Sequence, residues 1–305
     1  MKDYCDLHTH SSFSDGTCTP AELIQLAEEA GLGAVALCDH NTVAGLPEFL
    51  KAGEESLVEA VPGIEFSADY EGKELHILGL FIAAEYYGAV NELLNEALQR
   101  KEESNLELIR RLGEAGIILA YDRIKAEASG TVNRAVIASY LVREGYCASV
   151  KDAFRDWLAP EKGYFVPPKR LDAYGVIRFI KSIGAVAVLA HPFLNLEARE
   201  LRQFLSEAEG LDGMEVYYSL FNEDQTALAE RVAKEFGLLK SGGSDFHGEN
   251  KPDIRLGVGK GNLTVPMNCL EALKNRRQPL RKRNESAMIR KNKEIGAERM
   301  RKISC

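Results

Sequence analysis

The sequence predicts an α/β protein built on a parallel sheet, either doubly wound or closed as a barrel. Short apolar runs alternate with amphipathic helical stretches along most of the chain, which is the pattern of repeated βα units. The length of 305 residues suits one large domain with room for an insertion. Apolar residues make up 45% of the chain and charged residues 28%, so a sizeable globular core is available.

The apolar runs define the expected strands, which in chain order are 4–8, 34–38, 57–64, 74–81, 185–191, 213–217 and 238–241. Helices are expected between them at 20–30, 199–208 and 222–236. The first helix has clear boundary signals, because Thr19 can cap it, Pro20 suits its first position and Gly31 follows its end.

One region interrupts this alternation. Between residues 88 and 159 the sequence shows helical periodicity and no strand pattern, with helices expected at 90–115, 134–144 and 150–157. The βα alternation resumes afterwards. We therefore expect a discontinuous α/β domain at 1–87 and 160–273, a helical insertion domain at 88–159, and a basic tail at 274–305.

The net charge of −8 is divided unevenly. Residues 274–305 carry twelve Lys and Arg against three Glu, so the rest of the chain holds 17 more acidic than basic side chains. An acidic body argues against nonspecific nucleic-acid binding by the main domain. We interpret the tail as a solvated terminus, with contact to RNA or an acidic neighbour as the alternative.

The expected location is the cytoplasm. No apolar stretch approaches the about 18 residues of a membrane span, and the first expected strand begins too early to leave room for a signal peptide. Six cysteines without paired CxxC spacing are read as free thiols. No membrane contact and no obligate protein partner are expected.

The placement of the six histidines points to function. His8 and His10 end the first expected strand, where residues two apart project from one face. The others lie in "LCDHNTVAG", "ELHILGLF", "AVAVLAHP" and "SGGSDFHG", as His40, His76, His191 and His247. Each alone has an ordinary explanation as a solvated, turn or buried core residue. Five of the six, however, fall at or just past the end of an expected strand, the edge where parallel α/β folds place their sites.

Carboxylates join the histidines at the same edge. Asp15 follows the first histidine pair, Glu65 ends a strand in "VPGIEFSA", and Asp245 lies two residues before His247. Imidazoles and carboxylates that converge in this way favour a site for first-row divalent metal ions.

These segments also carry a family resemblance. "DLHTHSSFSDGTCTPAELIQLA", "ALCDHNTVAGL", "VPGIEFSA", "LHILGL", "LAHP" and "SGGSDFHG" resemble the ordered motifs of the PHP (polymerase and histidinol phosphatase) family. Within it, they are similar to stand-alone metal-dependent phosphoesterases that act on nucleotides. The resemblance implies a distorted (βα)7 barrel with a small helical insertion and a trinuclear metal centre of Mn²⁺, Fe²⁺ or Zn²⁺.

Carried over position by position, the resemblance implies three groups of ligands. The first ion would be held by His8, His10, Glu65 and Asp245. Glu65 would bridge to the second ion, which His76 and His191 complete. The third would be held by Asp15, His40 and His247. His191 and Asp245 are also expected to be catalytic. Asn41 departs from the Asp usual in this subgroup, which bears on substrate preference.

Two cationic residues are candidates for binding phosphate away from the metals. Arg134, in "TVNRAVIASYL", matches an Arg of the subgroup, and its guanidinium suits bidentate phosphate recognition. The alternative is an ordinary surface Arg. Lys162, in "EKGYFVPP", matches a subgroup loop and is expected to contact a second phosphate.

The resemblance implies a metal-dependent phosphoesterase, with water activated by the metals as the nucleophile. The expected substrate is a phosphate ester of a small nucleotide or phosphorylated ribose, as for 3′,5′-nucleoside bisphosphate phosphatases, which also trim short oligonucleotides. The alternative is a cyclic phosphodiesterase acting on a ribose cyclic phosphate. Histidinol phosphatase, amidohydrolase and non-catalytic accessory roles fit the motifs less well.

Overall fold

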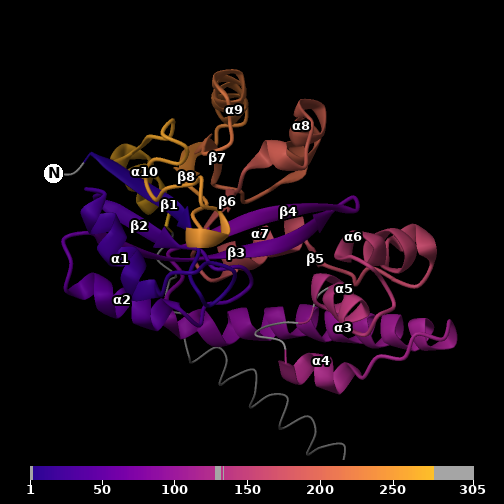
Figure 1. Ribbon diagram of the computed structural model, residues 1–305. Coiled ribbons are helices and arrows are strands. Elements are labelled where there is room, and N and C mark those ends of the chain that lie inside the picture. The colour runs from indigo at the N-terminus through magenta and orange to yellow at the C-terminus, as the bar shows by residue number, and fades with distance from the viewer. Residues whose placement is uncertain (1–2, 128–131, 133, 278–305) are drawn as a thin grey trace, which may run out of the picture.

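A single curved sheet forms the centre of the molecule (Figure 1). The computed structural model describes residues 3–127, 132 and 134–277. The strands are β1 Tyr4–Thr9, β2 Ala34–Leu37, β3 Glu59–Tyr70, β4 Lys73–Leu80, β5 Leu171–Asp172, β6 Val186–Leu189, β7 Gly213–Tyr218, β8 Leu239–Gly243 and β9 Val265–Pro266. Their order is β8-β7-β6-β4-β3-β2-β1-β9, with β5 paired to β3.

The sheet nearly closes into a barrel, as the family resemblance implies and in place of the doubly wound alternative. Thr9 at the end of β1 forms a parallel bridge with Phe246, just beyond β8. The amide of His10 donates to the carbonyl of Phe246 at 2.9 Å, and the amide of Asp245 donates to the carbonyl of His8 at 2.8 Å. The ends of β1 and β8 therefore meet at the segments that carry the HxH and DFH motifs.

One part of the predicted topology is wrong. The strands at 57–64 and 74–81 were expected to belong to parallel βα units, but β3 and β4 form an antiparallel hairpin, and β4 also runs antiparallel to β6. The hairpin turn is two residues long, and both residues, Glu71 and Gly72, have positive φ angles of 51° and 82°. This is the turn geometry that matches the twist of a hairpin. His76 consequently enters the site from a strand of opposite direction.

Helices cover the outside of the barrel: α1 Pro20–Glu29, α2 Leu46–Glu54, α7 Ala173–Ser182, α8 Ala198–Glu207, α9 Glu223–Glu235 and α10 Met267–Arg276. The predicted cap of α1 is present, since Thr19 Oγ1 accepts from the Glu22 amide at 3.2 Å and Glu22 accepts from the Thr19 amide at 2.7 Å. The sequence pattern did not predict α2, α7 and α10. Lys274, the first residue of the predicted tail, lies in α10, while residues 278–305 lie outside the described ranges.

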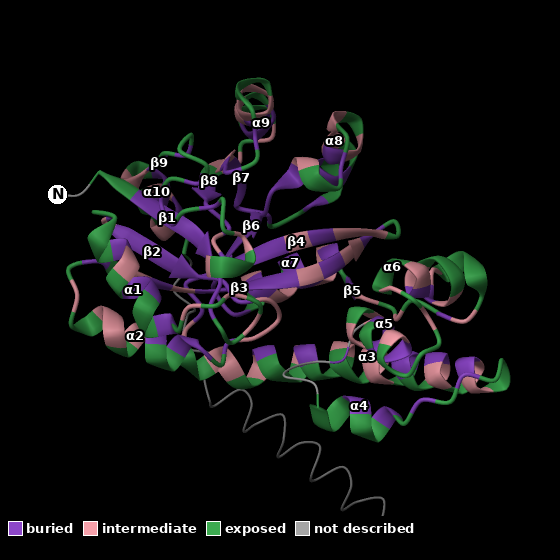
Figure 2. Ribbon diagram, in the orientation of Figure 1, coloured by how far each residue is buried: buried purple, intermediate pink, exposed green. Residues whose placement is uncertain are grey.

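The core lies between the strands and these helices (Figure 2). All four residues of β2 and of β6 are buried, as expected for strands covered on both faces. Phe49 of α2, Phe66 of β3 and Phe204 of α8 are fully buried. None of the helices in the described ranges is both long enough and apolar enough to cross a membrane.

A group of helices between β4 and β5 packs beside the barrel: α3 Tyr87–Glu114, α4 Tyr121–Glu127, α5 Arg134–Arg143 and α6 Val150–Ala153. The first half of α3 packs on the barrel core through Val90 and Leu94. Its second half contributes Leu108 and Leu112 to a separate hydrophobic cluster with the other helices. The helix α3 therefore connects the two cores, and its middle faces the site described next.

Candidate metal centre

The nine predicted metal ligands lie together at one end of the barrel. Strand ends and the loops after them supply most of these side chains, and β4 supplies His76 from within the hairpin. The donor atoms fall into four overlapping groups, each within 4.8 Å, that together contain His8, His10, Asp15, His40, Glu65, His76, His191, Asp245 and His247. The sequence thus predicted the membership of the cluster, although it misjudged the direction of one strand.

Glu65 occupies the middle of the cluster, and its two carboxylate oxygens face different imidazoles. Oε1 lies 2.8 Å from Nδ1 of His76 and 3.0 Å from Nε2 of His191. Oε2 lies 3.2 Å from Nε2 of His8 and of His10, and 3.0 Å from Nδ1 of His40. Glu65 is fully buried and imidazole nitrogens approach both of its oxygens, which is the arrangement required to bridge two ions.

Asp245 and Asp15 each join imidazoles on other sides of the cluster. Asp245 Oδ1 lies 3.2 Å from Nε2 of His10 and 3.8 Å from Nε2 of His8. Asp15 Oδ1 lies 3.2 Å from Nε2 of His247, and its Oδ2 lies 3.8 Å from Nε2 of His40. Asp245 thus lies with His8 and His10, and Asp15 lies with His40 and His247 but also near His10, while the ion that each residue would hold stays a prediction.

The nitrogen and oxygen atoms of the cluster are placed better for binding metal ions than for hydrogen bonds with one another. Nδ1 of His10, Nδ1 of His40 and Oε2 of Glu65 are buried and have no hydrogen-bond partner among the described residues. Nε2 of His8 and Nε2 of His10 face each other at 3.0 Å. Buried polar atoms without partners are rare in folded proteins and call for an explanation such as a bound ion. Imidazole and carboxylate donors also suit Mn²⁺, Fe²⁺ or Zn²⁺.

The cluster shifts the acidity of its own members. Burial alone would raise the pKa of Glu65, but the imidazoles of His8, His76 and His40 outweigh burial and hold that pKa well below its usual range. Burial lowers the pKa of His40 to about 4. It acts in the same direction on His76, but the Glu65 carboxylate prevails and raises that pKa to about 10. A metal ion requires neutral imidazole, so ion binding would release protons from this cluster.

Strained backbone holds two of the ligands. His191 and Asp245 have positive φ angles of 26° and 57°, which residues with a side chain rarely adopt. Nearby, a Cβ on Gly243 would lie 2.3 Å from Cβ of His8. Only glycine permits β8 to approach β1 this closely, and that approach brings the two sets of ligands together.

Two buried acids that the sequence does not assign hold parts of the site in place: Glu215 contacts two ligands, and Asp39 contacts the loop that follows His10. Glu215 Oε1 lies 3.0 Å from Nδ1 of His8, and its Oε2 accepts from the His191 amide at 2.6 Å. Asp39 accepts from the Ser11 amide at 2.7 Å and from the Ser11 hydroxyl at 2.6 Å. A signal for Glu215 was present, because "GMEVYY" places an acid inside an apolar strand, where a charge is buried only if it is paired.

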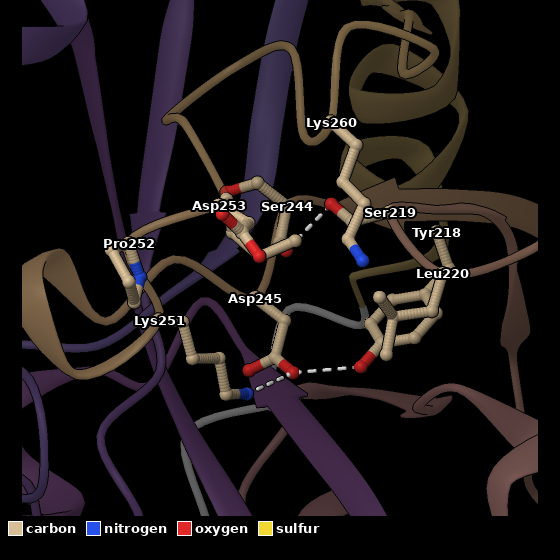
Figure 3. A pocket seen from close by; sticks show the side chains of 10 residues that line it. Tyr218, Ser219, Leu220, Ser244, Asp245, Lys251, Pro252, Asp253 and Lys260 are labelled. Carbon is tan, nitrogen blue, oxygen red and sulfur yellow. Dashed lines mark hydrogen bonds and ion pairs between the residues drawn. The ribbon is translucent and has the colours of Figure 1, made fainter.

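Asp245 also has contacts on the side away from the imidazoles. Its Oδ2 accepts from the Tyr218 hydroxyl at 2.8 Å and from Nζ of Lys251 at 2.7 Å (Figure 3). A small cavity of about 240 Å³ lies here, with Lys260 also on its wall. Burial and the neighbouring Asp245 raise the pKa of Tyr218 far above its usual value, so this hydroxyl remains a donor.

A larger cavity of about 700 Å³ opens beside Asp15 and His40. Four cationic side chains line it: Lys101, Arg134, Lys169 and Arg170. Arg134 begins α5, and its guanidinium lies 4.3 Å from the centre of the Phe165 ring. Arg170 forms an ion pair with Glu74 at 2.9 Å. Arg134, which the sequence predicts as a phosphate-binding residue, thus lines the same cavity as the candidate metal ligands Asp15 and His40. The other three cations are not predicted from the sequence.

Lys162 does not line this cavity, whereas Asn41 does. Lys162 is exposed on a turn at Pro160–Lys162 and is not among the residues that line this cavity, so its phosphate contact stays a prediction. Asn41 lines the cavity, and its side chain exchanges hydrogen bonds with Ser67, at 3.2 Å to the hydroxyl and 3.1 Å from the amide. It shapes the wall beside His40.

Comparison with known proteins places this cluster among phosphoester hydrolases. A family model described as "PHP domain" matches residues 6–165. The chain is 38% identical to a 5′-3′ exoribonuclease of Haemophilus influenzae, over 79% of this chain and 89% of that protein. It is 32% identical to the phosphoribosyl 1,2-cyclic phosphate 1,2-diphosphodiesterase of Eggerthella lenta, over 80% of this chain and 94% of that protein.

Two further matches agree. The chain is 30% identical to the 3′,5′-nucleoside bisphosphate phosphatase of Chromobacterium violaceum, over 82% of this chain and 90% of that protein. A crystal structure described as a metal-dependent phosphoesterase of Bifidobacterium adolescentis superposes with a TM-score of 0.69 at 29% identity, covering 90% of this chain and 97% of that one.

Proposed function

The chain belongs to the PHP family and is a metal-dependent phosphoester hydrolase, and from this premise we propose that its substrate is a nucleoside with two phosphates. The 3′-phosphate would react at the metal cluster, and the 5′-phosphate would lie on the cations around Arg134. A short oligonucleotide with a 5′-phosphate has a phosphodiester in place of the 3′-phosphate, and it falls within the proposal because hydrolysis would break the same bond to the 3′-oxygen.

The observation that carries this proposal is the shared cavity. The candidate ligands Asp15 and His40 line the same 700 Å³ space as Lys101, Arg134, Lys169 and Arg170. No described carboxylate lies within ion-pair distance of Arg134, and burial, followed by the neighbouring Arg170 guanidinium, lowers its pKa. Cations that crowd one another in a partly buried cavity favour an anionic ligand. A substrate with two separate phosphates would occupy both the metal cluster and these cations.

The residues of the chain divide the chemistry as follows. When bound, the divalent ions would supply Lewis acidity and lower the pKa of water at the reacting phosphate. Glu65, His191 and Asp245 would act as ligands. Glu215 accepts from the His191 amide and Tyr218 donates to Asp245, so these two residues would hold His191 and Asp245 in orientation. Arg134 would bind the non-reacting phosphate with its planar guanidinium and fix the distance to the reacting one. Hydrolysis adds the water oxygen to phosphorus, breaks the bond from phosphorus to the 3′-oxygen, and leaves a proton on that oxygen.

A substrate panel tests the proposal. It would contain a nucleoside 3′,5′-bisphosphate, the matching 3′- and 5′-monophosphates, a ribose cyclic phosphate and an amide. We expect the bisphosphate to have the highest kcat/KM and to yield the 5′-monophosphate and inorganic phosphate. Faster opening of the cyclic phosphate would instead assign the cyclic phosphodiesterase activity. Cleavage of the amide alone would contradict phosphoester chemistry.

A further inference from the structure

The wall of the large cavity has an apolar part that the phosphates do not use. Phe13, in the loop between β1 and α1, is 45% exposed, and Leu98 of α3 is 40% exposed. Both line the cavity that contains Asp15 and Arg134. Two large apolar side chains left exposed at the mouth of a metal cluster mark a surface that a ligand would cover.

Helix α3 arranges the polarity of this wall. Its cavity-lining residues are spaced so that they lie on one helix face: Leu94, Ala97, Leu98, Lys101 and Asn105. The face is apolar over the first three positions and becomes cationic at Lys101. The rise from Leu94 to Lys101 is about 10 Å. One end of the wall thus suits an uncharged planar group, and the other suits a phosphate.

We propose that Phe13, together with Leu98, forms a nucleobase subsite in which the base of the substrate stacks on the Phe13 ring. The inference rests on the proposed function and deepens it, because it names the residues that would recognise the base of that nucleoside. Every base offers a flat π face, so stacking on a phenylalanine accepts purines and pyrimidines alike. The chain would therefore distinguish the presence of a base much more than its identity.

The position of Phe13 supports a contact with substrate rather than a role in the core. Its amide donates to the Ser11 hydroxyl at 3.2 Å, and Ser11 in turn donates to Asp39, so the loop is fixed at its start. A Cβ on Gly45 would lie 3.2 Å from the Phe13 ring, which places the ring against that glycine. Phe13 is thus held beside the ligand Asp15 without being buried, with one part of its ring available to the cavity.

The test compares a nucleoside 3′,5′-bisphosphate with ribose 3,5-bisphosphate, which has both phosphates and no base. We expect the unmodified protein to have a KM for the nucleoside substrate about 10-fold below that for the base-free one. Phe13→Ala should remove this ratio by raising only the nucleoside KM. Phe13→Trp should preserve the ratio. The metal content of both variants should match that of the unmodified chain, since neither position is a ligand.

Two comparisons keep the test specific. Leu57→Ala removes an apolar side chain that is 87% exposed outside the cavity, and it should change neither KM. Leu98→Asp, on the part of the wall that α3 forms, should weaken binding of the nucleoside substrate more than that of the base-free one. Equal losses of both substrates in Phe13→Ala, or no loss, would overturn the subsite while the bisphosphatase proposal stands. If both bisphosphates are inert and only the cyclic phosphate is opened, the proposed function fails instead, and the same ratio is measured with nucleoside and ribose cyclic phosphates.

Discussion

Replacing Glu65 with glutamine tests the bridging arrangement at its centre. The change keeps the shape of the side chain but turns one carboxylate oxygen into an amide nitrogen, which cannot bind a cation. Glu65 is the one described residue whose two oxygens together approach imidazole nitrogens of His8, His10, His40, His76 and His191, at 2.8 to 3.2 Å. Either orientation of the amide therefore removes a donor from one ion, and the lost charge weakens the other.

The size of the effect follows from the lost charge. A carboxylate about 4 Å from a unit positive charge contributes about 4 kcal/mol at an effective dielectric constant of about 20. Since about 1.4 kcal/mol corresponds to a factor of ten, Glu65→Gln should weaken metal binding by about 10³-fold and abolish nearly all turnover. Elemental analysis after gel filtration would measure the ions per chain, and phosphate release would measure the rate. Glu54→Gln, at an exposed acid of α2, is the matched control. Full metal occupancy and an unchanged rate in Glu65→Gln would refute the bridge.

Three other substitutions separate the remaining roles. Arg134→Lys retains the charge but loses the planar guanidinium, so it should raise KM for a bisphosphate about 10-fold with little change in kcat, and leave an aryl phosphate with one phosphate unaffected; equal losses on both would remove Arg134 from phosphate recognition. His247→Ala should release mainly the ion near Asp15, because Nε2 of His247 lies 3.2 Å from Oδ1 of Asp15. Loss of every ion would contradict separate sites. Glu215→Gln should weaken metal binding by about 10- to 100-fold without unfolding the chain, because Glu215 orients His8 and the His191 backbone; unaltered metal affinity would show that this acid only packs.

Much of the site could be predicted from local sequence because parallel strands bring their ends to one edge. The ends of β1, β2, β6 and β8 carry His8, His40, His191 and Asp245, so identifying the strands was enough to gather the ligands. The hairpin between β3 and β4 was missed for a local reason. The first position of the two-residue turn holds Glu71, which has a positive φ angle, instead of the Asn, Asp or Gly that usually indicates such a turn, so the sequence gives only a weak hairpin signal here.

Other features could not be predicted because they arise only when distant segments meet. Lys101 on α3, and Lys169 and Arg170 before β5, are ordinary cations in sequence, and only the fold gathers them around the predicted Arg134. Helix α2 was missed because Pro47 and Gly53 resemble loop signals, whereas Pro47 occupies the first turn and tolerates the missing amide. The roles of Glu215 and Asp39 depend on contacts with residues distant in sequence, which become visible only in the folded chain.

The claim that the histidine and carboxylate cluster is a metal centre for phosphoester hydrolysis is tested most directly by removing and restoring the ions. The purified chain would be incubated with a nucleoside 3′,5′-bisphosphate before chelation, after exhaustive chelation, and after addition of Mn²⁺, Fe²⁺ or Zn²⁺ in separate samples, with released phosphate and bound metal measured together. We predict two to three ions per chain, loss of phosphate release with the ions, and recovery with at least one of the three metals. Full activity in a chain shown to be free of metal would contradict the account.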